Sequence, residues 1–255
     1  MNLQMDTTLG QTFSNKSQIA RVRTEDWAGR ELFCAACASP SLTQSPNNAK
    51  AIDFVCPQCQ AEYQLKSAAK WNENRIVDAG YDAMMDKIQK DETPHLLVLS
   101  YSPKWEVENL TLVPRFFFSA SSVQKRNPLA LTARRAGWVG CNILLSAIAT
   151  DGKLSVIQKG IAQSAAQVRA QYEKVKPLAK VSVDLRGWAL DVFACIRRLG
   201  KTDFVLADVY TFENYLAQLH PENNNVQPKI RQQLQVLRNA GLVQFLSPGR
   251  YRLIG

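Results

Sequence analysis

Apolar residues recur along the chain at intervals that separate expected helices from expected strands. Amphipathic helical spacing covers residues 16–33, 81–88, 161–172, 188–199, 206–219 and 226–237. Shorter apolar or alternating runs predict strands over residues 51–55, 61–67, 96–99, 107–113, 154–157, 242–245 and 251–254. Because helices and strands are mixed along the chain, the sequence predicts an α/β protein.

One predicted strand carries polar residues on alternate positions. In the run over residues 61–67, the polar face holds Glu62, Gln64 and Lys66, and the expected core face holds Tyr63 and Leu65. The preceding apolar run contains Asp53. An acid on one strand should therefore meet an amide and an ammonium on the next.

The order of the elements changes beyond a composition break near residues 179–184. Three amphipathic helices follow, and then two strands around Ser247-Pro248-Gly249, which is the order of a winged helix. The chain has 255 residues, enough for one large core or two modest ones, and its 46% apolar and 21% charged composition is typical of a globular protein. We expect a first domain over residues 1–182 and a winged-helix domain over residues 183–255.

The distribution of charge points to a polyanionic partner. The chain carries 31 basic and 22 acidic residues, a net charge of +9, yet neither residues 109–150 nor residues 223–255 contain an acid. Two acid-free basic stretches are typical of nucleic-acid binding, although a basic surface without a partner remains an alternative. No apolar run is long enough to span a bilayer and the N-terminus does not resemble a signal peptide, so a cytoplasmic protein without a membrane partner is expected.

Four cysteines in two Cys-x2-Cys pairs predict a zinc ribbon over residues 34–59. The pairs are Cys34 with Cys37 and Cys56 with Cys59. In the cytoplasm these residues should be thiolate ligands rather than disulfides. A set made of four thiolates favours structural Zn²⁺, because a catalytic zinc keeps an open coordination position.

The other cysteines and the histidines are expected to be structural. Cys141 and Cys195 lie in apolar surroundings and should be buried. His95 and His220 each lie beside a proline at an expected element boundary, far from the four paired cysteines in sequence. A structural or surface role is therefore expected for both histidines.

The hairpin around the second cysteine pair also carries the oxygen donors of a magnesium site. Asp53 offers a carboxylate, Gln64 an amide oxygen and Leu65 a backbone carbonyl, which together suit Mg²⁺. Phosphodiester hydrolysis needs such an ion, and Lys66 is then placed to orient or acidify the attacking water. A solvated strand face is the alternative interpretation of this short pattern.

The last predicted helix carries a polar face suited to the DNA major groove. That face holds Lys229, Arg231, Gln232, Gln235 and Arg238. Glutamine can bind the edge of adenine, and arginine can bind guanine or phosphate. Arg250 and Tyr251 on the expected wing would contact the DNA backbone or minor groove. A merely solvated helix face is the alternative.

A second DNA contact is expected within residues 132–138. Arg134 and Arg135 can bind phosphates there, and Trp138 offers an apolar surface to a base or a wedge into the base stack. A core position for Trp138 is the alternative.

Taken together, these motifs resemble the methyl-directed type II restriction endonucleases of the PD-(D/E)XK class. The matching stretches span nearly the whole chain in order: Thr24-Glu-Asp-Trp27, both Cys-x2-Cys pairs, Asp53-Phe54, Leu65-Lys-Ser67, Thr132-Ala-Arg-Arg-Ala-Gly-Trp138, Arg186-Gly-Trp188 and Ile230-Arg-Gln-Gln-Leu-Gln235. The resemblance implies a restriction-endonuclease-like core with an inserted four-cysteine zinc ribbon and a C-terminal winged helix. It also implies Mg²⁺-dependent cleavage of double-stranded DNA at GATC sites that carry N6-methyladenine, with the winged helix reading the same mark. A monomer is expected.

The chain departs from the family pattern at two positions of the candidate site. Gln64 stands where the family carries glutamate, and Ile52 rather than proline precedes Asp53. Gln64 removes a negative charge from the metal site, so affinity for the ion should fall unless another acid assists, and Glu62 and Glu25 are the candidates. Two other functions therefore stay open: a DNA-binding regulator with an inert nuclease core, and a nuclease that acts on a different modified base.

Overall fold

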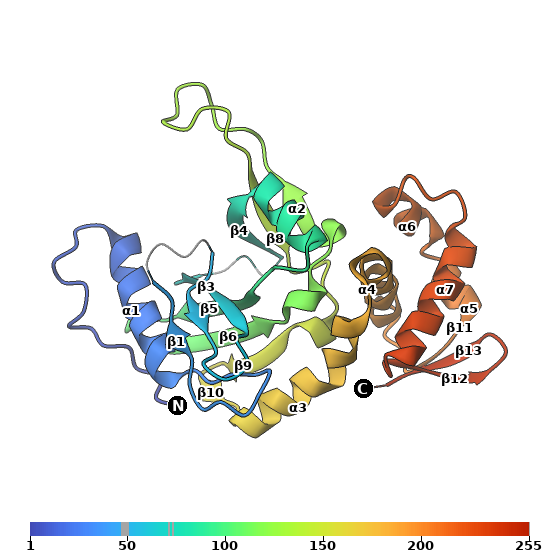
Figure 1. Cartoon of the computed structure of the whole chain (residues 1–255), viewed down its shortest axis with the longest axis horizontal. Helices are drawn as coiled ribbons and strands as arrows, with labels where there is room; N and C mark the ends of the chain where they lie inside the picture. Colours follow the sequence, from blue (N-terminus) through green and yellow to red (C-terminus); the bar gives the residue numbers. More distant parts are fainter. Residues whose placement is uncertain (47–50, 71, 73, 255) are drawn as a thin grey trace. The chain divides into compact units, whose positions relative to one another are not determined.

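The computed structural model describes residues 1–46, 51–70, 72 and 74–254, and the chain divides into two compact units (Figure 1). Unit 1 comprises Met1–Asn72, Pro94–Arg115 and Gly152–Glu173. Unit 2 comprises Glu73–Thr93, Phe116–Asp151 and Lys174–Gly255. Each unit is therefore assembled from three separate stretches of the sequence.

Unit 1 is built around a seven-stranded sheet with the order β1-β2-β3-β5-β6-β9-β10. Its strands are β1 (Thr43–Gln44), β2 (Phe54–Val55), β3 (Glu62–Ala68), β5 (His95–Tyr101), β6 (Val107–Val113), β9 (Leu154–Gln158) and β10 (Ile161–Ala162). Among the described strands of this sheet, β3 and β5 pair in parallel and the other neighbours pair in antiparallel. All four residues from Leu96 to Leu99 are buried, as their unbroken apolar run predicts.

Helix α1 (Lys16–Glu31) places its polar residues beside β3. The Asn15 side chain caps the helix by accepting a hydrogen bond from the Ser17 backbone N–H. Trp27 is fully buried, and the Thr24 hydroxyl lies 3.0 Å from the Ser67 hydroxyl on β3. Most of helix α3 (Ala165–Val175) also belongs to unit 1.

Unit 2 holds a small antiparallel sheet with the order β4-β8-β7. The strands are β4 (Arg75–Gly80), β7 (Val123–Lys125) and β8 (Gly140–Leu144), and α2 (Tyr81–Gln89) packs on them. Met84 and Ile88 of α2 are buried, which confirms that this apolar stripe serves the core. Short 3-10 helices cover Arg115–Phe117, Ala120–Ser122, Thr150–Gly152 and Lys176–Lys180.

The C-terminal part of unit 2 has the predicted winged-helix order. Its elements are α4 (Val183–Arg198), β11 (Asp203–Val205), α5 (Leu206–Tyr210), α6 (Glu213–Leu219), α7 (Val226–Asn239), β12 (Val243–Ser247) and β13 (Arg250–Leu253). Val192 and Phe193 of α4 and Ile230 and Leu237 of α7 are fully buried, and the two helices pack together. The α/β class with a C-terminal winged helix is therefore confirmed.

Turn chemistry explains two errors in the predicted helices. Ile161 belongs to β10 rather than to α3, because Lys159 and Gly160 both adopt positive φ and close a two-residue hairpin. The helix predicted over residues 206–219 is divided into α5 and α6. Helix α5 ends where the Thr211 hydroxyl donates a hydrogen bond to the Asp208 carbonyl, because this bond competes with continuation of the helix.

The strand predictions also need correction. The run over residues 51–55 forms a strand at Phe54–Val55 alone, and Ala51 at its start adopts positive φ. Leu65 is only partly buried whereas Gln64 is buried, so the two faces of β3 are less distinct than the alternation suggests. Strands β4, β7, β8 and β11 have no counterpart among the predicted elements.

The expected domain boundary at residues 182 and 183 stays a prediction. By its contacts, α4 belongs with residues 73–93 and 116–151, in the same compact unit as the rest of the winged helix. Within the described residues, no helix combines the length and the apolar character that crossing a bilayer requires.

Candidate functional site

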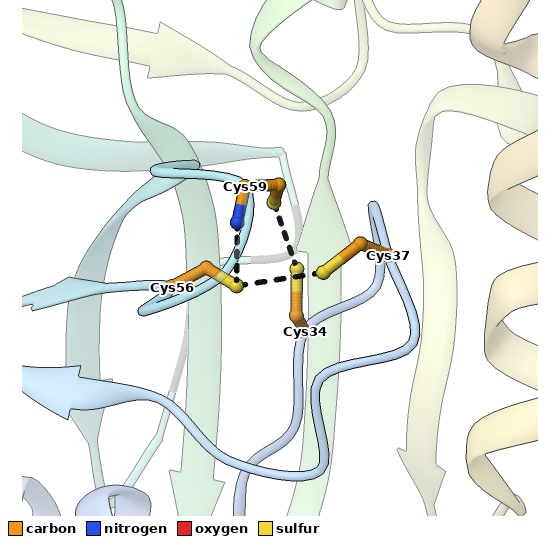
Figure 2. Close-up of side chains that lie close together, drawn as sticks. All are labelled: Cys34, Cys37, Cys56 and Cys59. Carbon is orange, nitrogen blue, oxygen red and sulfur yellow. Dashed lines mark hydrogen bonds between the residues drawn. The ribbon is translucent and has the colours of Figure 1, made fainter.

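Two loops of unit 1 bring four cysteine thiols together (Figure 2). Cys34 and Cys37 follow α1, and Cys56 and Cys59 lie in the turn between β2 and β3. The Sγ atoms of Cys34 and Cys59 are 3.6 Å apart, and those of Cys37 and Cys56 are 3.5 Å apart. Zn–S bonds of about 2.3 Å in a tetrahedron give S–S edges of about 3.8 Å. The four cysteines are thus positioned to bind a single metal ion such as zinc.

Backbone N–H groups point at the sulfur atoms of Cys56 and Cys37. The N–H groups of Gln58 and Cys59 point at the Cys56 Sγ at 3.4 and 3.5 Å, and the Ser39 N–H points at the Cys37 Sγ at 3.4 Å. Burial acts to raise the pKa of the Cys56 thiol, but these N–H groups and the neighbouring thiols outweigh it and lower that pKa to about 6. This shift favours the thiolate of Cys56, the form that binds metal, whereas burial raises the pKa of the Cys34 and Cys59 thiols.

Two residues outside the ribbon hold its first Cys-x2-Cys loop. The Tyr63 hydroxyl lies 3.2 Å from the Cys34 Sγ and accepts a hydrogen bond from the Ala35 N–H. Arg169 on α3 donates from Nε to the Cys34 carbonyl and from Nη2 to the Ser39 carbonyl, at 3.0 and 2.7 Å. The motif spacing gives no signal for Arg169, because its role depends on α3 lying against the ribbon.

The expected magnesium ligands line an open cleft of about 630 Å³ beside β3. Asp53, Gln64, Leu65 and Lys66 all contribute to its wall. Asp53 lies just before β2, where its Oδ2 accepts a hydrogen bond of 2.6 Å from the Leu65 N–H. The Asp53 N–H donates to the Tyr63 carbonyl at 2.9 Å. Backbone pairing therefore places the Asp53 carboxylate opposite the residues of β3 that the sequence predicts for the magnesium site.

Helix α1 adds a carboxylate and a guanidinium to the same cleft. Glu25 and Arg21 both line it, and the Arg21 Nε donates to the Glu25 Oε1 at 2.8 Å. That hydrogen bond to Glu25 raises the pKa of Arg21 above its usual value. Of the two acids expected to assist Gln64, Glu25 is in the cleft, whereas Glu62 is not among its described lining residues. Sequence reasoning missed Arg21, which lies one helical turn before Glu25 on the same face of α1.

The residues predicted to contact DNA lie on two surfaces of unit 2. On α7, Lys229 is partly exposed, and the exposed members of the predicted face are Arg231, Gln232, Gln235 and Arg238. On the wing, Arg250 is exposed, whereas Tyr251 stacks on Phe204 with ring centres 5.5 Å apart. The α7 face is therefore accessible, and the Tyr251 ring also serves the packing of the wing.

The second predicted DNA contact lies between β7 and β8. Arg134 and Arg135 are exposed there, and the Arg135 guanidinium lies 4.7 Å from the centre of the Trp138 ring. Trp138 is half-buried. It is therefore neither a fully buried core residue nor a freely exposed one.

The histidines and the remaining cysteines are structural, as expected. His95 is 2% exposed, its Nδ1 accepts a hydrogen bond from the Arg115 N–H, and burial lowers its pKa to about 3. His220 stacks on Trp188 and shares a hydrogen bond of 2.7 Å with Asp191. Cys141 and Cys195 are both fully buried, and burial raises the pKa of Cys195 to about 12.

Comparison with known protein families gives two matches that together span nearly the whole chain. Residues 1–181 match the DpnI family, described as the Dam-replacing family. Residues 184–253 match the C-terminal DpnI domain, described as the Dam-replacing HTH domain, and this range holds α4 to β13. On the strength of these two matches, the chain belongs to the DpnI, or Dam-replacing, family.

Proposed function

We propose that the chain is a methylation-dependent type II restriction endonuclease that hydrolyses double-stranded DNA at GATC sites carrying N6-methyladenine, with Mg²⁺. The observation that carries this proposal is the convergence of Asp53, Gln64 and Lys66 on one open cleft, in a member of the DpnI family. The four-cysteine ribbon supports it, because the ribbon and the cleft share the hairpin formed by β2 and β3.

The donor set of the cleft fits magnesium. Asp53 offers a carboxylate, Gln64 an amide oxygen and Leu65 a backbone carbonyl, and all are hard oxygen donors of the kind that Mg²⁺ prefers. The Glu25 carboxylate, in the same cleft, supplies the negative charge that Gln64 lacks. When bound, the ion would activate water and neutralise charge at the scissile phosphate.

The other residues of the cleft have separate roles in this proposal. The hydrogen bond from the Leu65 N–H orients the Asp53 carboxylate. Lys66 orients the attacking water and gives the transition state a positive charge at close range. Arg21 binds a neighbouring phosphate, and its ion pair with Glu25 holds both side chains at the wall of the cleft until DNA arrives.

The accessible face of α7 supports a second site that reads DNA. One methyl group in an apolar pocket provides only about 1 to 3 kcal/mol of discrimination. Requiring the methyl group once in the nuclease and again in the winged helix compounds that preference, so unmodified DNA is better spared. The exposed Gln232 and Gln235 are placed to read adenine edges in the major groove.

The test is cleavage of one plasmid prepared with and without adenine methylation at GATC, in the presence of Mg²⁺. We expect the full-length chain to cut the methylated plasmid and Asp53→Asn to abolish cutting. This variant retains an acceptor for the Leu65 N–H, and an unchanged zinc content shows that the hairpin is intact. Asp86→Asn is the matched control, because Asp86 is an exposed carboxylate on α2 in a surface ion pair with Lys90.

Other results distinguish the alternatives. Tight binding of methylated DNA without cutting would favour a DNA-binding regulator. The negative charge lost at Gln64 supports this alternative function. Cutting of a plasmid with another base modification, and not of the adenine-methylated one, would show a nuclease of different specificity. Cutting that survives in Asp53→Asn would refute the proposed catalytic site.

A further inference from the structure

The segment between β7 and β8, residues 126–139, is an arm that extends from the small sheet of unit 2 (Figure 1). Its two sides are paired through the backbone. The Arg126 N–H donates to the Gly140 carbonyl, the Leu129 N–H to the Trp138 carbonyl, and the Gly137 N–H to the Leu129 carbonyl, at 2.9, 2.9 and 3.1 Å. The arm is therefore a stalk of two paired sides that carries a turn at its tip.

Trp138 braces the base of the arm. Its indole packs over Gly140, where an added Cβ would lie 2.9 Å from two carbons of the ring, so any larger residue would force the indole to shift. The ring also lies close to Gly80 at the end of β4. The Arg135 guanidinium lies over the same ring, at a distance that allows a cation–π contact.

The tip of the arm presents an apolar side chain to solvent. Leu131 is 92% exposed, the highest value among the large apolar side chains that the structure describes. Leu129, two residues before it, is 36% exposed. A backbone hydrogen bond from the Ala133 N–H to the Ala130 carbonyl closes the turn around Leu131. A tightly turned backbone with a leucine at its apex has the form of a wedge.

The charges along the arm and at its base favour a polyanionic partner. Lys125, Arg126, Arg134 and Arg135 are all exposed beside the stalk, and residues 109–150 contain no acid. A hydrophobic pocket of another protein would match Leu131 but not four cations. Duplex DNA matches both features, because proteins insert apolar wedges between base pairs while their basic side chains bind the adjacent phosphates.

We propose that Leu131 inserts between stacked base pairs of the substrate duplex, with Arg134 and Arg135 on the flanking phosphates. This inference rests on the proposed function in one respect, namely that the substrate is duplex DNA. It adds a contact at the tip of the arm that opens one base step and bends the helix there. Pyrimidine–purine steps unstack most easily, so the insertion selects for them.

The experiment measures base unstacking directly. Full-length chain is bound, with Ca²⁺ in place of Mg²⁺ so that DNA is not cut, to short duplexes that carry one methylated GATC site. In each duplex a single 2-aminopurine, which fluoresces when unstacked, occupies a different step in or beside the site. We expect fluorescence to rise at one step and to lose that rise in Leu131→Ala, with binding weakened roughly tenfold.

The matched control is Ile161→Ala, which removes a side chain that is 73% exposed on β10 in unit 1, outside the acid-free stretches. It should keep both the affinity and the fluorescence rise. Arg134→Ala should weaken binding and lower its dependence on salt, because a phosphate contact is lost, whereas Leu131→Ala should leave the salt dependence unchanged.

The results separate the wedge from the proposed function. If the unsubstituted chain binds and cuts methylated DNA but no step brightens, or if Leu131→Ala brightens like the unsubstituted chain, the wedge is refuted and the nuclease stands. If the unsubstituted chain binds no duplex, the proposed function fails, and the wedge fails with it.

Discussion

The hydroxyl of Tyr63 lies 3.2 Å from the Sγ of Cys34, on the side of β3 away from the candidate catalytic cleft. The next residue along the strand, Gln64, lines that cleft. Because successive side chains of a strand point to opposite faces, β3 connects the four-cysteine site to the expected magnesium ligands. Loss of the metal from the four cysteines should therefore disturb the positions of the expected magnesium ligands in the cleft.

Replacement of one cysteine ligand should remove the zinc and loosen the cleft. We expect Cys37→Ser to lose bound zinc, because three thiolates leave the tetrahedral site incomplete. The hydrogen bond from the Leu65 N–H to Asp53 should then open, since the turn between β2 and β3 is no longer pinned. Zinc content by mass spectrometry and hydrogen exchange of the Leu65 amide measure both effects. Cys195→Ala, at a buried thiol of α4, should keep its zinc; equal loss in both variants would contradict the assignment.

Removal of the Tyr63 hydroxyl should weaken the ribbon without emptying it. In Tyr63→Phe the Ala35 N–H loses its acceptor, and an unsatisfied buried donor costs about 1 to 3 kcal/mol. We expect faster zinc release to a chelator and a lower free energy of unfolding. Tyr215→Phe, in α6 of unit 2, is the control and should release zinc at the unsubstituted rate.

The buried His95 should make the protein less stable in mild acid. Its pKa is about 3 in the folded chain against 6.5 for an exposed histidine, so the unfolded chain binds the additional proton. The contribution of neutral His95 to the free energy of unfolding is fully present above pH 6.5 and is lost as pH falls toward 3. The loss is about 1 kcal/mol between pH 6.5 and about pH 5.5. His95→Asn, whose amide oxygen can still accept from the Arg115 N–H, should show a shallower decline in urea unfolding. Parallel curves, at equal zinc content, would argue against this origin.

The buried Asp191 should contribute far more to stability than an exposed aspartate in a similar pair. Its carboxylate accepts a hydrogen bond from Ser121 and shares one with His220, and its side chain is 5% exposed. Breaking a buried pair on one side costs about 3 to 5 kcal/mol, so Asp191→Ala should strongly lower the free energy of unfolding. Asp203→Ala breaks the exposed pair with Arg252 and should change it little. Similar losses in the two variants would contradict the ranking.

Restoration of an acid at residue 64 should increase the affinity of the cleft for divalent cations. Gln64→Glu adds a carboxylate beside Asp53 and Glu25, so we expect roughly tenfold tighter Mg²⁺ binding, measured by titration calorimetry and by the Mg²⁺ concentration needed for half-maximal cleavage. Gln89→Glu adds the same charge at the exposed end of α2 and should change neither quantity. Unchanged affinity in Gln64→Glu would show that residue 64 is not a metal ligand.

Local pattern was sufficient to predict the cysteine cluster, the buried strand around Leu96 and the winged-helix order. Each of these depends on spacing within a short stretch of sequence. The hairpin at Lys159 and Gly160 was missed, because two positive φ values outweigh the helical stripe that Ile161 extends. Pattern also gave no signal for Arg169 or Arg21, because each acts across elements distant in sequence.

The three-part composition of each unit determines when the protein can fold during its synthesis. β3 must wait for β5, its parallel neighbour, and unit 1 is complete only after Glu173 has left the ribosome. Unit 2 must wait for α4, which carries Arg186 and Arg197, the partners of Asp91 and Asp151. A chain released early would expose unpaired strand edges, which promote aggregation. Translation that stops before α4 should therefore leave unit 2 unassembled, and quality control should remove such material.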